Sequence, residues 1–157
     1  MKNIAILADY DIAKRPRPYR AALALHKKFK LFLIAKECSD LKLKNVKTFS
    51  YPKAESNAQT RTEKEKLAIK QAIQNKEFNK LIYTKNRLKI IEILDTLPTL
   101  DAILVEDITL LAFALNYKKQ HKKCKIVIDL REFYPLEYND IEWKNSFGIF
   151  FTYLCKE

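Results

Sequence analysis

Six short apolar runs, each separated from the next by a longer polar or helix-period segment, constrain the fold of this chain most strongly. Such runs are typical of strands that are buried on both faces of a parallel sheet. We expect strands at Asn3–Ala8, Leu31–Ala35, Val46–Ser50, Lys80–Thr84, Ala102–Val105 and Lys125–Ile128. Because strands and helices alternate, the pattern predicts an α/β fold, a Rossmann-like open parallel sheet of about six strands with helices on both faces.

The length and the cysteines narrow the class of protein. A chain of 157 residues matches one domain, and we expect residues 1–157 to form a single domain whose core needs no disulfide or metal. The three cysteines fit no metal-ligand spacing and are typical of reduced thiols. The start MKNIAILADY does not resemble a signal peptide, and no apolar run approaches the roughly 20 residues that span a bilayer. We therefore expect a cytoplasmic protein.

The net charge of +11 suggests an affinity for anions. Lys outnumbers Arg by 24 to 6, whereas nucleic-acid surfaces favour Arg because its guanidinium makes paired hydrogen bonds. We interpret the charge as a solvated basic surface and do not expect nucleic acid as a partner. A contact with anionic lipid headgroups is compatible with this surface, and it would place the protein at the inner face of the membrane.

Charged side chains follow several of the predicted strands at the point where each strand ends. They are Asp9, Glu106, Asp107 and Asp129, and the turn after the first strand adds Arg15, Arg17 and Arg20. In an open α/β sheet, ligands bind beyond the carboxyl ends of the strands. We therefore expect these residues to meet at one substrate-binding rim, where carboxylates orient sugar hydroxyls and arginines hold phosphates.

Each of these residues also has a structural interpretation. Asp107 precedes an apolar helical stripe and is a natural N-cap. The three arginines suit the solvated side of a helix start. Asp129 and Glu132 could pair with Arg131 as surface ion pairs, which contribute little to stability.

Several standard sites are absent from the sequence. Its only glycine is Gly148, so there is no glycine-rich loop for a dinucleotide or a nucleoside triphosphate. There is also no nucleophile elbow and no His/Cys metal motif. We expect neither a metal nor another cofactor.

Two stretches, IAILADYDIAKRPRPYRAALAL and DAILVEDITLLAFALNYKKQHKKCKIVIDLREFYP, carry a resemblance to a known family. In this order they resemble the N-terminal domain of GT-B glycosyltransferases, of the large retaining (family 4-like) class that often acts in bacterial surface-polysaccharide biosynthesis. In that family a strand leads to Asp-x-His-Glu, followed by aromatics and a proline or an acid. Asp129, Glu132 and Phe133 match this pattern, and Arg131 stands where the family commonly has His.

The resemblance implies an enzyme with a second domain. A C-terminal domain, absent from these 157 residues, would hold the nucleotide-sugar donor, and this domain would bind a glycan or lipid-linked acceptor. Alone it would be inactive or nearly so. Asp129 and Glu132 would orient the acceptor or fix the loop, while Arg131 would meet negative charge on the acceptor or donor; these three are the candidate catalytic residues. Arg15, Arg17 and Arg20 would contact a phosphate or a polyprenyl-phosphate headgroup.

The end of the chain leaves an alternative open. Aromatic residues share one face of a predicted last helix, namely Trp143, Phe147, Phe150 and Phe151. This face could pack on the domain's own sheet, on a second domain, on a partner chain or on a membrane surface. The alternative function is accordingly a non-catalytic binding module, complete at 157 residues, that forms a homodimer through these four residues.

Overall fold

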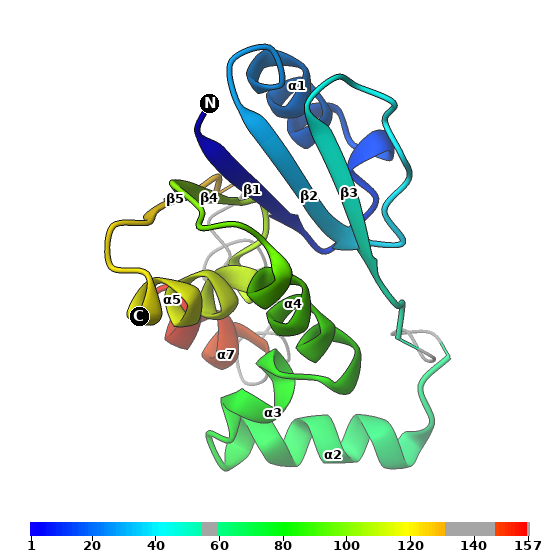
Figure 1. Ribbon diagram of the computed structural model, residues 1–157. Helices are drawn as coiled ribbons and strands as arrows, with labels where there is room; N and C mark the ends of the chain where they lie inside the picture. The colour runs from blue at the N-terminus through cyan, green and yellow to red at the C-terminus, as the bar shows by residue number, and fades with distance from the viewer. Residues whose placement is uncertain (55–59, 131–146, 157) are drawn as a thin grey trace. The chain divides into compact units, whose positions relative to one another are not determined.

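The computed structural model describes residues 1–54, 60–130 and 147–156 (Figure 1). The chain divides into two compact units, which are described separately below. The first unit comprises residues 1–53 and 85–130, and the second comprises residues 54–84 and 131–157. The single domain expected from the chain length stays a prediction.

The first unit is built on a five-stranded sheet in which every pair of neighbouring strands is parallel (Figure 1). The strand order is β3-β2-β1-β4-β5. The strands are β1 (Asn3–Ala8), β2 (Lys30–Lys36), β3 (Val46–Tyr51), β4 (Ala102–Val105) and β5 (Lys125–Ile128). The predicted α/β fold with an open, Rossmann-like parallel sheet is therefore confirmed, with five strands in place of about six.

Helices cover both faces of this sheet. The register pairs Ile6 of β1 with Leu33 of β2 and Leu104 of β4, and this face packs against Ala22 of helix α1 (Pro16–Leu25). Side chains alternate along a strand, so the neighbouring residue Leu7 points to the opposite face. Helices α4 (Lys85–Thr96) and α5 (Leu111–Gln120) cover that face, with α4 in contact with β3 and α5 in contact with β4 and β5.

In the described part of the chain, two short 3-10 helices link strands to helices, and each has an aspartate as its N-cap. Asp11 accepts a hydrogen bond from the backbone N–H of Ala13 at the start of η1 (Ile12–Lys14). Asp107 accepts one from the N–H of Thr109 at the start of η2 (Ile108–Leu110). Such caps satisfy backbone donors that a helix start leaves unbonded. The N-cap interpretation of Asp107 is confirmed.

The second unit contains helices α2 (Glu63–Gln74), α3 (Phe78–Ile82) and α7 (Phe147–Leu154). Helix α2 begins with a capping box, in which Thr62 Oγ1 accepts from the N–H of Glu65 and the Glu65 carboxylate accepts from the N–H of Thr62. Helix α7 packs on α3 through Phe78, whose ring centroid lies 5.8 Å from that of Phe150 and 4.5 Å from that of Tyr153. The second unit therefore has its own aromatic contacts.

The strand predicted at Lys80–Thr84 is wrong, because residues Phe78–Ile82 form helix α3. A short apolar run cannot by itself separate a buried strand from a buried helix turn. Here the two buried residues, Phe78 and Ile82, are four positions apart and so lie on one helical face, while Lys80 between them is exposed. The N–H of Tyr83 donates to the carbonyl of Asn79, as a helical turn requires.

The apolar last helix is present in part. Trp143 lies outside the described residues, and Phe150 is only 5% exposed. Phe147 and Phe151 are half-buried. The homodimer through these residues stays a prediction, although the ring of Phe150 is already covered by its own chain. Among the helices that the structure describes, none has the length and apolar character needed to cross a membrane.

Candidate functional site at the carboxyl edge of the sheet

Strand register brings three polar side chains together at the carboxyl edge of β1, β2 and β3. Lys36 pairs in register with Tyr51, and Asp9 follows Ala8, which pairs with Ala35. Because side chains alternate along a strand, Asp9, Lys36 and Tyr51 all belong to the face that α4 covers. Arg87, in the first turn of α4, meets them there.

The carboxylate of Asp9 is the centre of this group. Arg87 Nη2 lies 2.8 Å from Asp9 Oδ2, and Lys36 Nζ lies 3.5 Å from the same oxygen. The Tyr51 hydroxyl lies 2.7 Å from Asp9 Oδ1 and 3.0 Å from the carbonyl oxygen of Ala8. Both carboxylate oxygens are therefore engaged by donors from other elements.

Arg87 also connects Asp9 to the end of β4. Its Nη2 donates to Thr109 Oγ1 at 3.0 Å, and the Thr109 hydroxyl donates to Asp107 Oδ1 at 2.6 Å. We call these six residues the Asp9 cluster: Asp9, Lys36, Tyr51, Arg87, Asp107 and Thr109. The structure thus brings Asp9 and Asp107, two of the predicted carboxylates, into one network. Arg87 and Thr109 make the link between them.

The electrostatics of the Asp9 cluster favour a fixed ion pair over acid–base chemistry. Burial raises the pKa of Asp9, but Arg87, the Tyr51 hydroxyl and Lys36 lower it by more, so that this pKa lies below the ordinary value of 3.8. Burial, reinforced by the charge of Asp9, raises the pKa of Tyr51 far above its usual range. Asp9 therefore stays ionised and Tyr51 stays a hydroxyl donor at neutral pH.

A second group of polar side chains lies on the other face of the sheet, beside α1. The Tyr10 hydroxyl donates to the backbone carbonyl of Glu106 at 3.3 Å, and the Arg15 guanidinium lies 5.3 Å from the centroid of the Tyr10 ring. Arg17 Nη1 lies 3.3 Å from Asp129 Oδ1. We call these five residues the α1-side cluster: Tyr10, Arg15, Arg17, Glu106 and Asp129.

Members of the α1-side cluster differ strongly in exposure. The Glu106 residue is 1% exposed, whereas the side chains of Arg17 and Asp129 are 51% and 38% exposed. An ion pair that is this exposed contributes little to stability, because water competes for both partners. Breaking the ion pair between Arg17 and Asp129 therefore costs little free energy, so both side chains are available to bind a ligand.

The turn between β1 and α1 is hollowed next to this cluster. A pocket of about 440 Å³ is lined by the turn and by the first residues of α1, including Lys14, Arg15, Tyr19 and Arg20. Arg20 Nε donates to the carbonyl of Pro16 at 3.2 Å, which fixes the guanidinium against the helix start. The pocket presents three cations and one aromatic ring.

Asp11 fixes the base of this turn. Its carboxylate accepts from the Ser39 hydroxyl at 2.6 Å, from the Ser39 N–H at 3.0 Å and from the Ala13 N–H at 3.1 Å. Burial raises the pKa of Asp11, but these hydrogen bonds and the one with Lys14 lower it by more, so it lies below the usual value. Asp11 therefore ties the turn after β1 to the loop after β2.

The residues predicted to form one rim lie at the carboxyl edge, but the sheet divides them into two groups, and their role in substrate binding stays a prediction. Asp9 and Asp107 belong to the Asp9 cluster, whereas Glu106 and Asp129 belong to the α1-side cluster. Of the three predicted arginines, Arg15 and Arg17 join the α1-side cluster, and Arg20 lines the neighbouring pocket. Arg131 and Glu132 lie outside the described residues.

Sequence reasoning missed Tyr51, Arg87 and Thr109. Tyr51 ends a strand and could have been found from the same argument that selected Asp9. Thr109, two residues after an aspartate, fits an Asx-type turn. Arg87 follows Lys80–Thr84, where the sequence predicts a strand and the structure has a helix, and its contact with Asp9 spans 78 residues, so no local pattern reveals it.

Among the residues that the structure describes, no group of His, Cys, Asp and Glu side chains could hold a metal ion. Comparison of the chain with protein-family models, with curated proteins and with solved structures finds no match.

Proposed function

We propose that this chain is the acceptor-binding, N-terminal domain of a GT-B glycosyltransferase, which transfers a sugar from a nucleotide-sugar donor to a glycan or lipid-linked acceptor. The observation that supports this best is the position of the α1-side cluster. It lies at the carboxyl ends of β1, β4 and β5. The strand order reverses between β1 and β4, which is the place where open α/β sheets bind ligands.

The chemistry of the α1-side cluster suits a sugar that carries a phosphate. Carboxylates such as Asp129 accept hydrogen bonds from sugar hydroxyls, and guanidinium groups such as Arg15 and Arg17 make charge-assisted bonds to phosphate oxygens. The exposed pair between Arg17 and Asp129 offers both functions side by side. When a ligand binds, Arg17 would bind its phosphate and Asp129 would accept hydrogen bonds from its sugar hydroxyls.

The donor, on this proposal, binds to a second domain. The chain has one glycine, Gly148, and it lies outside the turn after β1. A glycine-rich turn at that position is what allows a backbone to approach a diphosphate closely. Helix α1 follows this turn, and its first and third residues, Pro16 and Pro18, lack backbone N–H donors.

The Asp9 cluster has a supporting role in this proposal. Its carboxylates are engaged by Arg87, Tyr51 and Thr109, so it holds the edge of the sheet in place beside α4. Arg131 and Glu132, which lie outside the described residues, stay candidate catalytic residues. Replacing either in a two-domain parent enzyme should lower the transfer rate.

Titration calorimetry with sugar phosphates tests the proposal. We expect at least one hexose 1-phosphate among glucose, galactose and mannose 1-phosphate to bind about 10-fold more tightly than inorganic phosphate, a difference of about 1.4 kcal/mol from contacts to the sugar. Uridine should add no affinity, so UDP-glucose should not bind more tightly than glucose 1-phosphate. Markedly tighter binding of UDP-glucose would show that the chain holds the donor itself and would overturn the acceptor assignment.

Two variants and one control sharpen this test. Arg17→Gln should weaken binding of both the hexose phosphate and inorganic phosphate, whereas Asp129→Asn should weaken only the hexose phosphate. Both side chains are exposed, so neither change should disturb folding. Lys118→Gln, at an exposed position of α5, removes the same charge as Arg17→Gln and should leave both affinities unchanged.

A further inference from the structure

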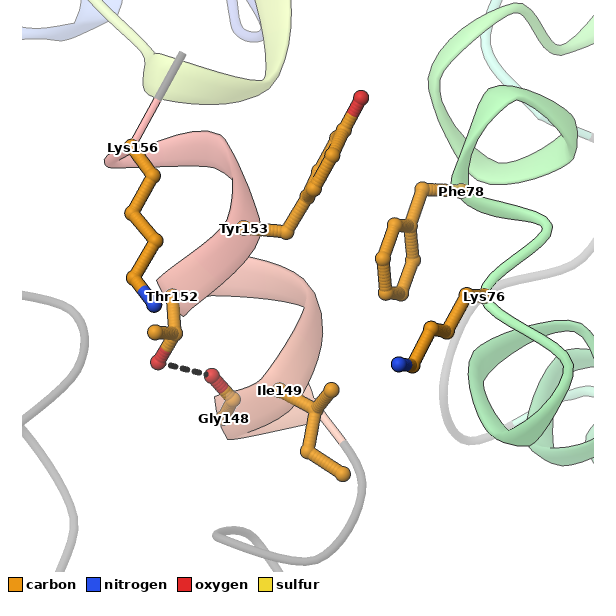
Figure 2. Close-up of a pocket in the computed structure, with 7 residues that line it drawn as sticks. All are labelled: Lys76, Phe78, Gly148, Ile149, Thr152, Tyr153 and Lys156. Carbon is orange, nitrogen blue, oxygen red and sulfur yellow. Dashed lines mark hydrogen bonds between the residues drawn. The ribbon is translucent and has the colours of Figure 1, made fainter.

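The second unit contains a cavity that the proposed function does not use. It lies between α3 and α7, has a volume of about 500 Å³, and is shown in Figure 2. Ligand pockets in proteins have volumes of roughly 300–1,000 Å³. The cavity is therefore large enough for a small molecule or for part of a lipid chain.

One side of the cavity is apolar. The rings of Phe78 and Tyr153 pack together with their centroids 4.5 Å apart, and Ile149 projects beside them (Figure 2). Ile149 is 42% exposed, so a large aliphatic side chain is left in contact with solvent. Covering this surface with an apolar ligand would remove it from water, which is favourable.

Gly148 forms part of the cavity wall and is the only glycine of the chain. Glycine is less favourable in a helix than any residue except proline. Positive φ does not explain its use here, because the described residues include no glycine with positive φ. Gly148 is buried, and any other residue would add side-chain volume at the wall.

Two cations border the apolar surface, and the described lining contains no acidic side chain. Lys76 comes from the turn between α2 and α3, and Lys156 follows α7. The hydroxyl of Thr152 donates to the carbonyl of Gly148 at 2.7 Å, as Figure 2 shows. Charge complementarity thus favours an anionic ligand, and it disfavours a second copy of a chain that carries a net charge of +11.

We propose that the cavity between α3 and α7 binds an amphiphile with a single alkyl chain and an anionic headgroup. The alkyl chain would lie along Phe78, Ile149 and Tyr153, where Gly148 leaves room for it. The headgroup would lie near Lys76 or near Lys156, whose side chains extend on different sides of α7 (Figure 2). This site is independent of the α1-side cluster and of the transferase assignment.

Titration calorimetry with dodecyl phosphate, below its micelle concentration, tests this proposal. We expect dodecyl phosphate to bind about 10-fold or more tightly than either dodecyl maltoside, which lacks the charge, or inorganic phosphate, which lacks the chain. The double variant Lys76→Gln/Lys156→Gln should lose about 10-fold in affinity for dodecyl phosphate. A matched double variant of exposed lysines in α5, Lys118→Gln/Lys119→Gln, should bind as the parent does.

Gly148 supplies the sharpest variant. Gly148→Val should abolish binding by filling the wall, and Gly148→Ala should weaken it, because Gly148 is buried and a methyl group adds volume there. A cooperative thermal unfolding transition of Gly148→Ala shows that the variant is folded, and loss of affinity in a folded variant then reports a filled cavity. Equal affinity of the parent, Gly148→Ala and the Lys76/Lys156 double variant would overturn the proposal.

Vesicles distinguish a cavity from a membrane-docking surface. If the chain binds phosphatidylglycerol vesicles but not monomeric dodecyl phosphate, the lysines serve a membrane surface and the cavity proposal is wrong. Binding of the monomer, weakened by Gly148→Ala, supports the cavity whether or not vesicles bind. The result does not depend on sugar binding, so it stands or falls separately from the proposed function.

Discussion

The guanidinium of Arg87 lies 2.8 Å from the carboxylate of Asp9, although 78 residues separate them in the chain. The contact joins the end of β1 to the first turn of α4. Only 16% of the Arg87 side chain and 20% of the Asp9 side chain are exposed. The pair is therefore screened from water far better than the Arg17–Asp129 pair on the other face of the sheet.

Removing the arginine should destabilise the chain. Arg87→Met leaves the Asp9 carboxylate without its principal partner, a change that costs about 3–5 kcal/mol for fully buried pairs. Because both side chains retain some exposure, we expect a loss of about 2 kcal/mol in the free energy of unfolding. Urea denaturation followed by circular dichroism measures it.

An exposed ion pair provides the control for Arg87→Met. Lys89 and Glu92 pair on the solvated side of the same helix, and Lys89→Met should change the stability by no more than about 0.5 kcal/mol. A double-mutant cycle with Asp9→Asn isolates the coupling between Asp9 and Arg87. Additive effects in that cycle would show that the contact does not contribute as described.

Tyr51→Phe tests the second partner of Asp9. The hydroxyl lies between Asp9 Oδ1 and the carbonyl of Ala8, and phenylalanine leaves both acceptors without this donor. Hydrogen bonds to charged groups contribute about 1.5–3 kcal/mol, and Arg87 and Lys36 remain on Asp9, so we expect a loss of about 1–2 kcal/mol. The control Tyr19→Phe removes the hydroxyl of a tyrosine that is exposed and should be nearly neutral.

Stability should fall in acid because of Asp9 and Asp11. Both carboxyl groups have a pKa below 3.8 in the folded chain, whereas in the unfolded chain the pKa is about 3.8. At a pH between these two values, the unfolded state therefore binds more protons than the folded state. Their contribution is present above pH 3.8 and is lost as the pH falls through the folded pKa values. Unfolding free energies measured from about pH 5 to about pH 2 should therefore decrease, and Asp9→Asn should flatten the curve. A slope unchanged by Asp9→Asn would contradict the assigned pKa direction.

The second unit can be probed through the capping box of α2. Thr62→Ala removes the side-chain oxygen that accepts from the N–H of Glu65, a cap that contributes about 1 kcal/mol. Amide hydrogen exchange in the first turns of α2 should accelerate about 5-fold. Lys64→Ala, at an exposed position of the same turn, should leave these exchange rates nearly unchanged.

The strands were largely predictable from the sequence. The bounds of β1, β4 and β5 are those expected, and β2 extends by one residue at each end. Their apolar runs are short and closed by charged or polar residues, which is the signal of a buried parallel strand. The run at Lys80–Thr84 carries the same signal but forms α3, because burial of Phe78 and Ile82 on one helical face decides its structure.

The candidate site was predictable only in outline. Asp9, Glu106, Asp107 and Asp129 were expected at the carboxyl edge, because parallel strands share one edge. Their division between two faces follows from side-chain alternation and register, and register depends on which strands pair. Arg87 could not be predicted, because it reaches Asp9 by tertiary packing of α4.

An NMR titration of the uniformly ¹⁵N-labelled chain with the hexose 1-phosphate that binds most tightly shows whether the α1-side cluster binds a sugar phosphate. We expect amide shift changes concentrated at the α1-side cluster (Tyr10, Arg15, Arg17, Glu106 and Asp129), larger than those caused by inorganic phosphate, and absent around Arg87 and Tyr51. Shift changes that are spread over the surface lysines and are the same for inorganic phosphate would overturn the proposed function, because they would show a basic surface without a sugar site.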